Sequence, residues 1–156
     1  MDFIFRAANL DDIAELVNLR FSLINEDGLG DQVQRTPVFE SYVRDYFTNA
    51  ISDRSYFGSV AEADGRLVSN IGLVLYRKPP SFNGQNGLVG YLSNAYTLPE
   101  FRNRGIASEL MKIIIAHAEL MKIAKIHLGT SEDGRKLYAK FGFKDVQFPA
   151  LELRLN

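Results

Sequence analysis

Cysteine is absent from the 156 residues of this chain. Without a thiol, the chain can form no disulfide, no thiolate metal site and no covalent intermediate on a cysteine nucleophile. The sequence also lacks any apolar run near the roughly 18 residues that a membrane-spanning helix needs. Its first residues, 1–6, do not have the basic and then apolar layout of a secretory signal. We therefore expect a cytoplasmic protein with no membrane partner.

An excess of charge of either sign is absent as well. The sequence has 18 Lys and Arg against 19 Asp and Glu, a formal net charge of −1. This balance provides no basic surface for binding nucleic acid in bulk. Its apolar content of 46% and its length are ordinary for one globular domain with a full core. We expect a single domain over residues 1–156 that has no nucleic-acid partner.

The best-known phosphate-binding motifs are missing too. The sequence contains neither the P-loop pattern G-x-x-x-x-G-K-S/T nor the dinucleotide-binding pattern G-x-G-x-x-G. It does contain a basic loop, 102–107 (RNRGIA), between an extended run and a long apolar run. The first amides of a helix lack partners and carry partial positive charge, and Gly105 permits close approach of a ligand. With Arg102 and Arg104 as partners for phosphate oxygens, the loop predicts a pyrophosphate site.

Two segments of the chain resemble the Gcn5-related N-acetyltransferase (GNAT) superfamily. The loop matches the pattern R/Q-x-x-G-x-G/A, with Arg102, Gly105 and Ala107 at the defining positions. Residues 131–143 are similar to the last helix of the family and its Tyr-x-x-x-Gly-Phe ending. One helix and one strand are expected between the two segments, which is also the spacing of the family.

The expected order of elements agrees with this resemblance. In chain order we expect a strand over 3–6, helices beginning near Asn9 and Pro37, strands over 55–63, 67–76 and 90–97, a helix over 106–121, a strand over 125–130, a helix over 134–141 and a last strand over 145–155. The resemblance implies a mixed α/β fold. Its twisted central sheet would be mostly antiparallel with one splayed parallel strand pair, and helices would cover both faces.

The resemblance also implies that acetyl-CoA, as co-substrate, lies in the gap of the splayed strands, and it implies no metal. Backbone groups of Ala95 and Thr97 would pair with the pantetheine amides, and an amide near Thr97 would polarise the thioester. The residues assigned to acetyl-CoA in this way are Ala95, Tyr96, Thr97, Leu98, Arg102, Asn103, Arg104, Gly105, Ile106, Ala107, Ser108, Ser131 and Arg135. Ser131 stands where many members have asparagine and could instead be a helix cap, and Arg135 could equally face solvent.

Tyr138 matches the family's tyrosine near the departing sulfur. Direct attack by an amine leaves a thiolate, and a phenol with a pKa of about 10 can protonate it. The general base is left open, because Tyr91 occupies the position where members with a strand glutamate carry that carboxylate. Water held by Ser93, Asn94 or Tyr91 could serve. The two histidines, His117 and His127, are expected to pack in the core.

The sequence thus predicts an acetyl-CoA-dependent N-acetyltransferase that acts by direct attack in a ternary complex. A non-catalytic acyl-CoA-binding module of the same fold is the alternative. The acceptor would be a primary amine on a small molecule or a protein, bound near the first two helices and the loop between them. There, Glu26, Asp27 and Asp31 could attract a cationic amine, and Arg20 could bind an acceptor carboxylate. Members of the family often form homodimers, so this chain is a candidate for one.

Overall fold

The computed structural model describes residues 2–26 and 34–155. Its strands are β1 (Ile4–Ala7), β2 (Tyr56–Ala63), β3 (Arg66–Arg77), β4 (Leu88–Thr97) and β5 (Ile126–His127). They form one sheet in the order β1-β2-β3-β4-β5. Neighbours are antiparallel as far as β4, which then pairs with β5 in parallel. The predicted sheet, mostly antiparallel with one parallel pair, is confirmed.

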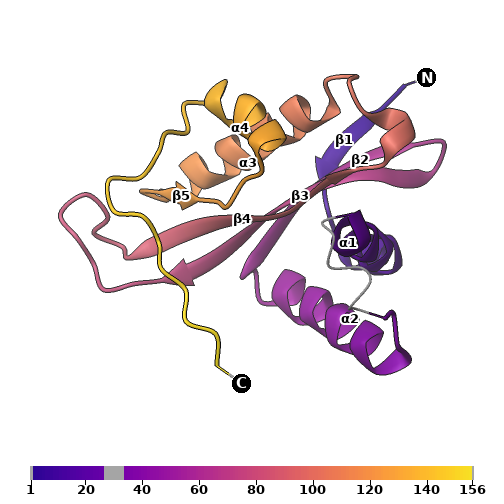
Figure 1. Cartoon of the computed structure of the whole chain (residues 1–156), viewed down its shortest axis with the longest axis horizontal. Coiled ribbons are helices and arrows are strands. Elements are labelled where there is room, and N and C mark those ends of the chain that lie inside the picture. The colour runs from indigo at the N-terminus through magenta and orange to yellow at the C-terminus, as the bar shows by residue number, and fades with distance from the viewer. Residues whose placement is uncertain (1, 27–33, 156) are drawn as a thin grey trace.

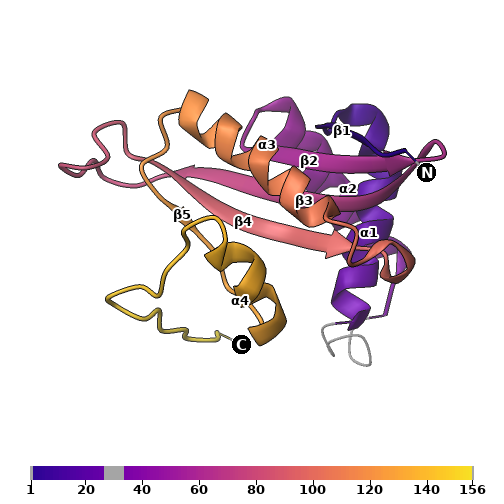
Figure 2. The same cartoon turned by 90° about the horizontal axis from the view of Figure 1, so that it is seen from above.

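Helices cover both faces of this sheet, also as predicted (Figures 1 and 2). They are α1 (Ile13–Glu26), α2 (Pro37–Ser52), α3 (Ile106–Leu120) and α4 (Glu132–Ala139). Side chains of α1 and α2 pack in one apolar cluster on the sheet, and those of α3 and α4 pack in the other. The central strand β3 is buried without interruption from Leu67 to Leu73, because it has helices on both sides.

Local turn and cap chemistry places the element boundaries. The Thr36 hydroxyl accepts a hydrogen bond from the Phe39 amide at 3.1 Å, and Pro37 begins α2. Asp64 and Gly65 both have positive φ, 49° and 75°, as the tight hairpin between β2 and β3 requires. The predicted helix start and hairpin are therefore confirmed.

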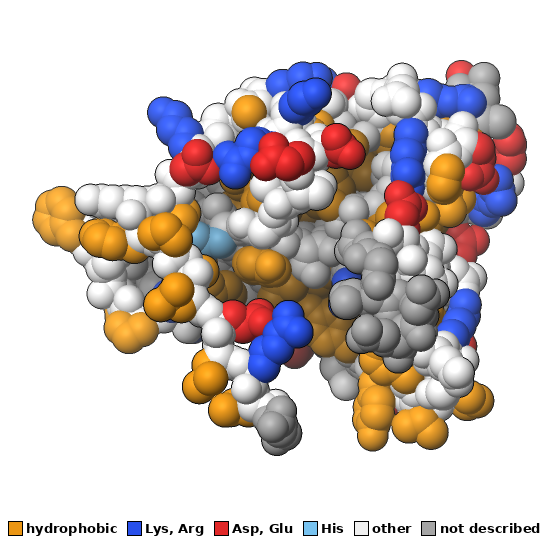
Figure 3. All heavy atoms as spheres, viewed as in Figure 1, with side chains coloured by type: hydrophobic (Ala, Val, Ile, Leu, Met, Phe, Trp, Pro, Cys, Tyr) orange, Lys and Arg blue, Asp and Glu red, His pale blue; other side chains and the backbone are white. Residues whose placement is uncertain are grey.

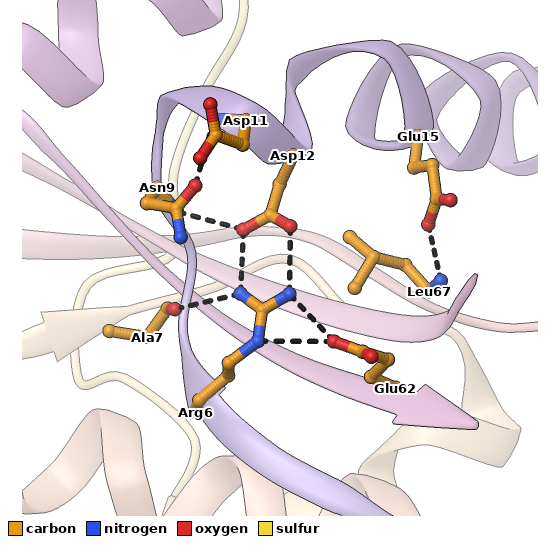
Figure 4. A network of polar contacts seen from close by, with 8 residues as sticks. All are labelled: Arg6, Ala7, Asn9, Asp11, Asp12, Glu15, Glu62 and Leu67. Carbon is orange, nitrogen blue, oxygen red and sulfur yellow. Dashed lines mark hydrogen bonds and ion pairs between the residues drawn. The ribbon is translucent and has the colours of Figure 1, made fainter. Parts of the chain in front are cut away.

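An ion-pair network ties β1 and β2 to the start of α1 (Figure 4). The Arg6 guanidinium donates to both carboxylate oxygens of Asp12, at 2.7 and 2.9 Å, and to Glu62 at 2.9 Å. The Asp12 carboxylate also accepts from the Asn9 amide at 2.8 Å, and this bond is one half of a capping box at the predicted helix start. Burial of Asp12 opposes its ionisation, but the hydrogen bonds from Arg6 and Asn9 outweigh this effect. The pKa of Asp12 is therefore below its ordinary value.

Substituting Asp12→Asn is expected to lower the free energy of unfolding by about 2 kcal/mol at neutral pH, because Arg6 loses its most buried anionic partner. Since the folded pKa of Asp12 lies below the ordinary value of 3.8, this contribution is present above that pH. It is lost as the pH falls through the folded pKa. Denaturant unfolding at neutral and at acid pH measures both effects. The control Asp11→Asn removes an exposed acid from the same turn and should change stability by less than about 0.5 kcal/mol. Equal losses for the two variants would contradict the expectation.

The predicted last strand is wrong, and β5 is shorter than predicted. Residues 145–155 have no strand pairing in the structure, although leucines alternate there. Leu151, Leu153 and Leu155 are 99%, 82% and 86% exposed. The alternation is a local pattern, but a strand also needs a partner edge, and β5 has only two residues. Figure 3 shows hydrophobic side chains projecting at the end of the molecule where this segment and the β3–β4 loop lie.

Candidate functional site

A gap opens between β4 and β5. Their parallel pairing joins Gly90 to Ile126 and Tyr91 to His127 and, in the part of the chain that the structure describes, goes no farther. Beyond this point β4 continues to Thr97, whereas the chain leaves β5 toward α4. The backbone groups along this edge of β4 are therefore open to an extended ligand, which could pair with them as a further strand would.

A bulge changes the direction of β4 beside the gap. Gly72 pairs with Ser93 but Asn70 pairs with Tyr96, so two residues of β4, 94 and 95, lie opposite one residue of β3. Asn94 has a φ of 53°, in the left-handed region that asparagine tolerates better than most residues. Bulges of this kind re-aim backbone groups and occur often beside active sites.

The loop before α3 contains two residues with left-handed backbone. Asn103 and Gly105 have positive φ, 60° and 77°. Turns of this kind direct successive N–H groups to one side and make an anion-binding hollow. Gly105 is the N-cap of α3 and provides no side-chain cap, and a Cβ placed on it would meet no atom within 4 Å. The side chain of Ile106 is buried in the core, and Ala107 and Ser108 follow in the first turn of the helix.

The side chains of the two loop arginines are held by groups of the protein. Arg102 donates to the Thr97 carbonyl at 2.9 Å and to the Glu26 carboxylate at 2.6 Å. The Tyr96 hydroxyl donates to the same carboxylate at 2.9 Å. Hydrogen bonds from Arg102 and then Tyr96 hold the pKa of Glu26 below its ordinary value, so this carboxylate is a poor proton acceptor. Arg104 donates to the Glu100 carbonyl at 3.1 Å.

Three further predicted site residues lie on α4 or cap it. The Ser131 hydroxyl caps this helix and accepts from the Gly134 amide at 3.2 Å. Arg135 forms an exposed ion pair with Asp145 at 2.6 Å. Tyr138 is buried, and with Arg135 it lines a cavity of about 260 Å³ between β5 and α4. Burial raises the pKa of Tyr138, so its hydroxyl stays protonated at neutral pH and can donate a proton.

The residues considered for proton removal are dispersed. Tyr91 on β4 is 42% exposed and pairs with His127 on β5. His127 is half-buried and lines the small cavity as well as a larger one of about 1140 Å³ along the C-terminal segment. His117 stacks on Phe57 with ring centroids 3.7 Å apart, and burial lowers its pKa. This packed position of His117 agrees with the prediction from its helical spacing.

On the face of the sheet that α1 covers, Arg20 donates to the Asn94 side chain at 2.9 Å. The buried pair Tyr56 and Asn70 lies in the same layer, and these two residues were missed by the sequence analysis. An asparagine within the apolar run of β3 was the available signal. Of the predicted acids, Glu26 pairs with Arg102, whereas Asp27 and Asp31 lie outside the described residues.

The described ranges contain neither a metal-ligand cluster nor a membrane-spanning helix. Residues 2–26 and 34–155 hold no group of three or more His, Cys, Asp or Glu that could bind a metal ion. No helix in these ranges is both long and apolar enough to span a bilayer.

Comparisons with known proteins agree with this geometry. The model of the acetyltransferase (GNAT) family matches residues 14–143. A predicted acetyltransferase from Clostridium acetobutylicum, solved with acetyl-CoA, is 27% identical with a TM-score of 0.86, over 98% of this chain and 96% of that one. A GCN5-related N-acetyltransferase from Ralstonia eutropha JMP134 is also 27% identical, with a TM-score of 0.78, over 97% of this chain and 99% of that one. A ribosomal-protein-alanine N-acetyltransferase from Brucella melitensis shares the fold at 22% identity, with a TM-score of 0.71, over 99% of this chain and 100% of that one. A search of curated proteins finds no match.

Proposed function

Because this chain belongs to the acetyltransferase (GNAT) family, we propose that it transfers the acetyl group of acetyl-CoA directly to a primary amine. One observation carries the proposal. The parallel pairing of β4 with β5 stops at Tyr91 and His127, α3 begins after β4 at a Gly105 that has no side-chain cap, and Tyr138 on α4, which follows β5, carries a buried hydroxyl with a raised pKa. An anion-binding end, a channel with free backbone groups and a proton donor are the three parts that a bound thioester needs.

The backbone supplies most of the proposed binding. Amides of the loop 103–107 hold the pyrophosphate, since the side chains of Arg102 and Arg104 have partners in the protein. The pantetheine arm lies along the open edge of β4 and pairs with the backbone at Ala95 and Thr97. This arrangement explains why a bulge, which exposes backbone groups, lies beside the gap.

The acetyl transfer follows from these positions. The amine nitrogen attacks the thioester carbonyl carbon, a C–N bond forms and the C–S bond breaks. An amide of the stretch 95–98 stabilises the charge on the carbonyl oxygen. The leaving thiolate takes the proton of the Tyr138 hydroxyl, and water removes the proton that the nitrogen releases. Tyr138 recovers its proton from solvent when free CoA leaves.

Thermal unfolding with increasing acetyl-CoA tests the binding part of the proposal. Ligand at about a hundred times its dissociation constant should stabilise the fold by roughly 2.7 kcal/mol, whereas ATP and NAD should have little effect. An equal rise with all three ligands would contradict a specific acetyl-CoA site.

Release of free thiol in the presence of an amine panel then tests the chemistry. Thiol release with at least one primary amine is expected. Specific binding without release for any amine would favour the alternative, an acyl-CoA-binding module.

A further inference from the structure

Arg20 differs from every other arginine of the chain in its surroundings. Only Arg6 and Arg20 are partly buried, and all the others are exposed. Arg6 is neutralised by the carboxylates of Asp12 and Glu62. Arg20 has no carboxylate partner in the described residues, and its one side-chain hydrogen bond goes to the neutral amide of Asn94 at 2.9 Å. A guanidinium in this position, with no carboxylate of the described residues against it, is available to an anion from outside the protein.

The layer around Arg20 is polar although it lies between helices and a sheet. Asn94 is 7% exposed and belongs to the β4 bulge. Tyr56 and Asn70 lie fully buried in the same layer, with their side-chain oxygens 3.4 Å apart. In the described part of the chain, Asn70 Nδ2 is the one fully buried side-chain nitrogen or oxygen without a partner. Buried side-chain nitrogens and oxygens usually have a partner in the protein or in an ordered water molecule, so this nitrogen marks a polar spot that the described residues leave without a partner.

Part of the Arg20 guanidinium is available to a ligand. The Nη1 group is used by Asn94, whereas Nε and Nη2 have no acceptor among the described residues and are not sealed from solvent. These two N–H groups form one edge of the planar fork. That edge matches the two oxygens of a carboxylate, which it can bind bidentately.

Arg20 lies next to the reacting centre of the proposed function. Its partner Asn94 directly precedes Ala95, where the open edge of β4 is proposed to hold the pantetheine arm. Arg20 reaches Asn94 from α1, on the sheet face opposite α3 and α4 (Figure 1). A molecule whose anion is bound by Arg20 therefore places its other atoms beside the bulge.

We propose that Arg20 binds a carboxylate of the acceptor, so that the substrate is an amine that carries a carboxylate a few bonds away, such as a free amino acid. Bidentate binding by Nε and Nη2 places the amine toward the gap between β4 and β5. The inference rests on the proposed acetyl transfer, whose own failure is visible earlier, when acetyl-CoA alone fails to raise the melting temperature.

The test compares amino acids with their α-carboxamides as acceptors in the thiol-release assay. Each pair keeps the amine and differs in the charge of the acid group. For the full chain, kcat/KM should be higher for the acids, and Arg20→Gln should lower it about 100-fold for acids and less than about 3-fold for carboxamides. Arg20→Lys keeps the positive charge but lacks the planar pair of N–H groups, so its kcat/KM for acids should lie between those of the parent protein and Arg20→Gln. The control Arg44→Gln, an exposed arginine on α2, should leave both values unchanged.

Two results would overturn the inference. An equal loss for acids and carboxamides would mean that Arg20 only supports the bulge through Asn94. No loss for either would mean that Arg20 does not face the acceptor. If no amine in the panel reacts, melting temperature in saturating CoA is measured with the same acids and their N-acetyl derivatives. A rise that Arg20→Gln abolishes supports the inference, and no rise with any carboxylate refutes it.

Discussion

Replacing Tyr138 by phenylalanine is expected to lower kcat about 100-fold and to leave the dissociation constant of acetyl-CoA within about twofold. The substitution removes only the hydroxyl, and the ring keeps its contact with Phe143, whose centroid is 5.7 Å away. Because the hydroxyl is proposed to protonate the leaving sulfur, its loss should raise the barrier of the chemical step and leave the free energy of binding unchanged. Steady-state kinetics and titration calorimetry measure the two quantities separately.

The pH profile adds a second readout for Tyr138. Burial raises its pKa above the ordinary value of 10.0, so the hydroxyl that we propose as the proton donor stays protonated throughout the neutral range. The rise of kcat/KM with pH should therefore report deprotonation of the amine, and Tyr138→Phe should lower the whole curve without moving it. The exposed Tyr42→Phe on α2 is the control and should match the parent protein. An unchanged kcat in Tyr138→Phe would exclude this residue as the proton donor.

Placing a carboxylate in the hollow before α3 is expected to abolish most acetyl-CoA binding. We predict that Gly105→Asp raises the dissociation constant about 100-fold, since a negative charge would lie beside the pyrophosphate. Aspartate tolerates the positive φ of this position better than most residues, and its Cβ would meet no atom of the protein within 4 Å. The free energy of unfolding should therefore change by less than about 1 kcal/mol.

Gly105→Asn separates the effect of charge from the effect of shape. Asparagine has nearly the same size and a similar tolerance of positive φ, but it is neutral. In Gly105→Asn the dissociation constant of acetyl-CoA should rise less than about fivefold. The difference between the dissociation constants of the two variants should become smaller at high salt, because added ions screen the repulsion. Titration calorimetry at two salt concentrations measures this difference. Equal weakening by both substitutions would mean that the hollow does not hold an anion.

The sequence determined those features that depend on residues close together in the chain. The hairpin at Asp64 and Gly65 and the start of α2 at Pro37 are examples, because turns and helix caps are made by neighbouring backbone groups. The turn at Gly105 before α3 belongs to the same class, because it too is made by neighbouring backbone groups. That this turn binds an anion stays a prediction from the motif.

Only the tertiary structure decided which distant side chains meet. Arg102 bonds to Glu26, 76 positions away, and Arg20 bonds to Asn94, 74 positions away. Both contacts arise because α1 packs across β4, and this packing has no signature within a window of the sequence. The alternating leucines of 151–155 are the converse case. Their pattern predicts a strand, but the chain offers β5 as an edge of only two residues, and a strand forms only where backbone partners exist.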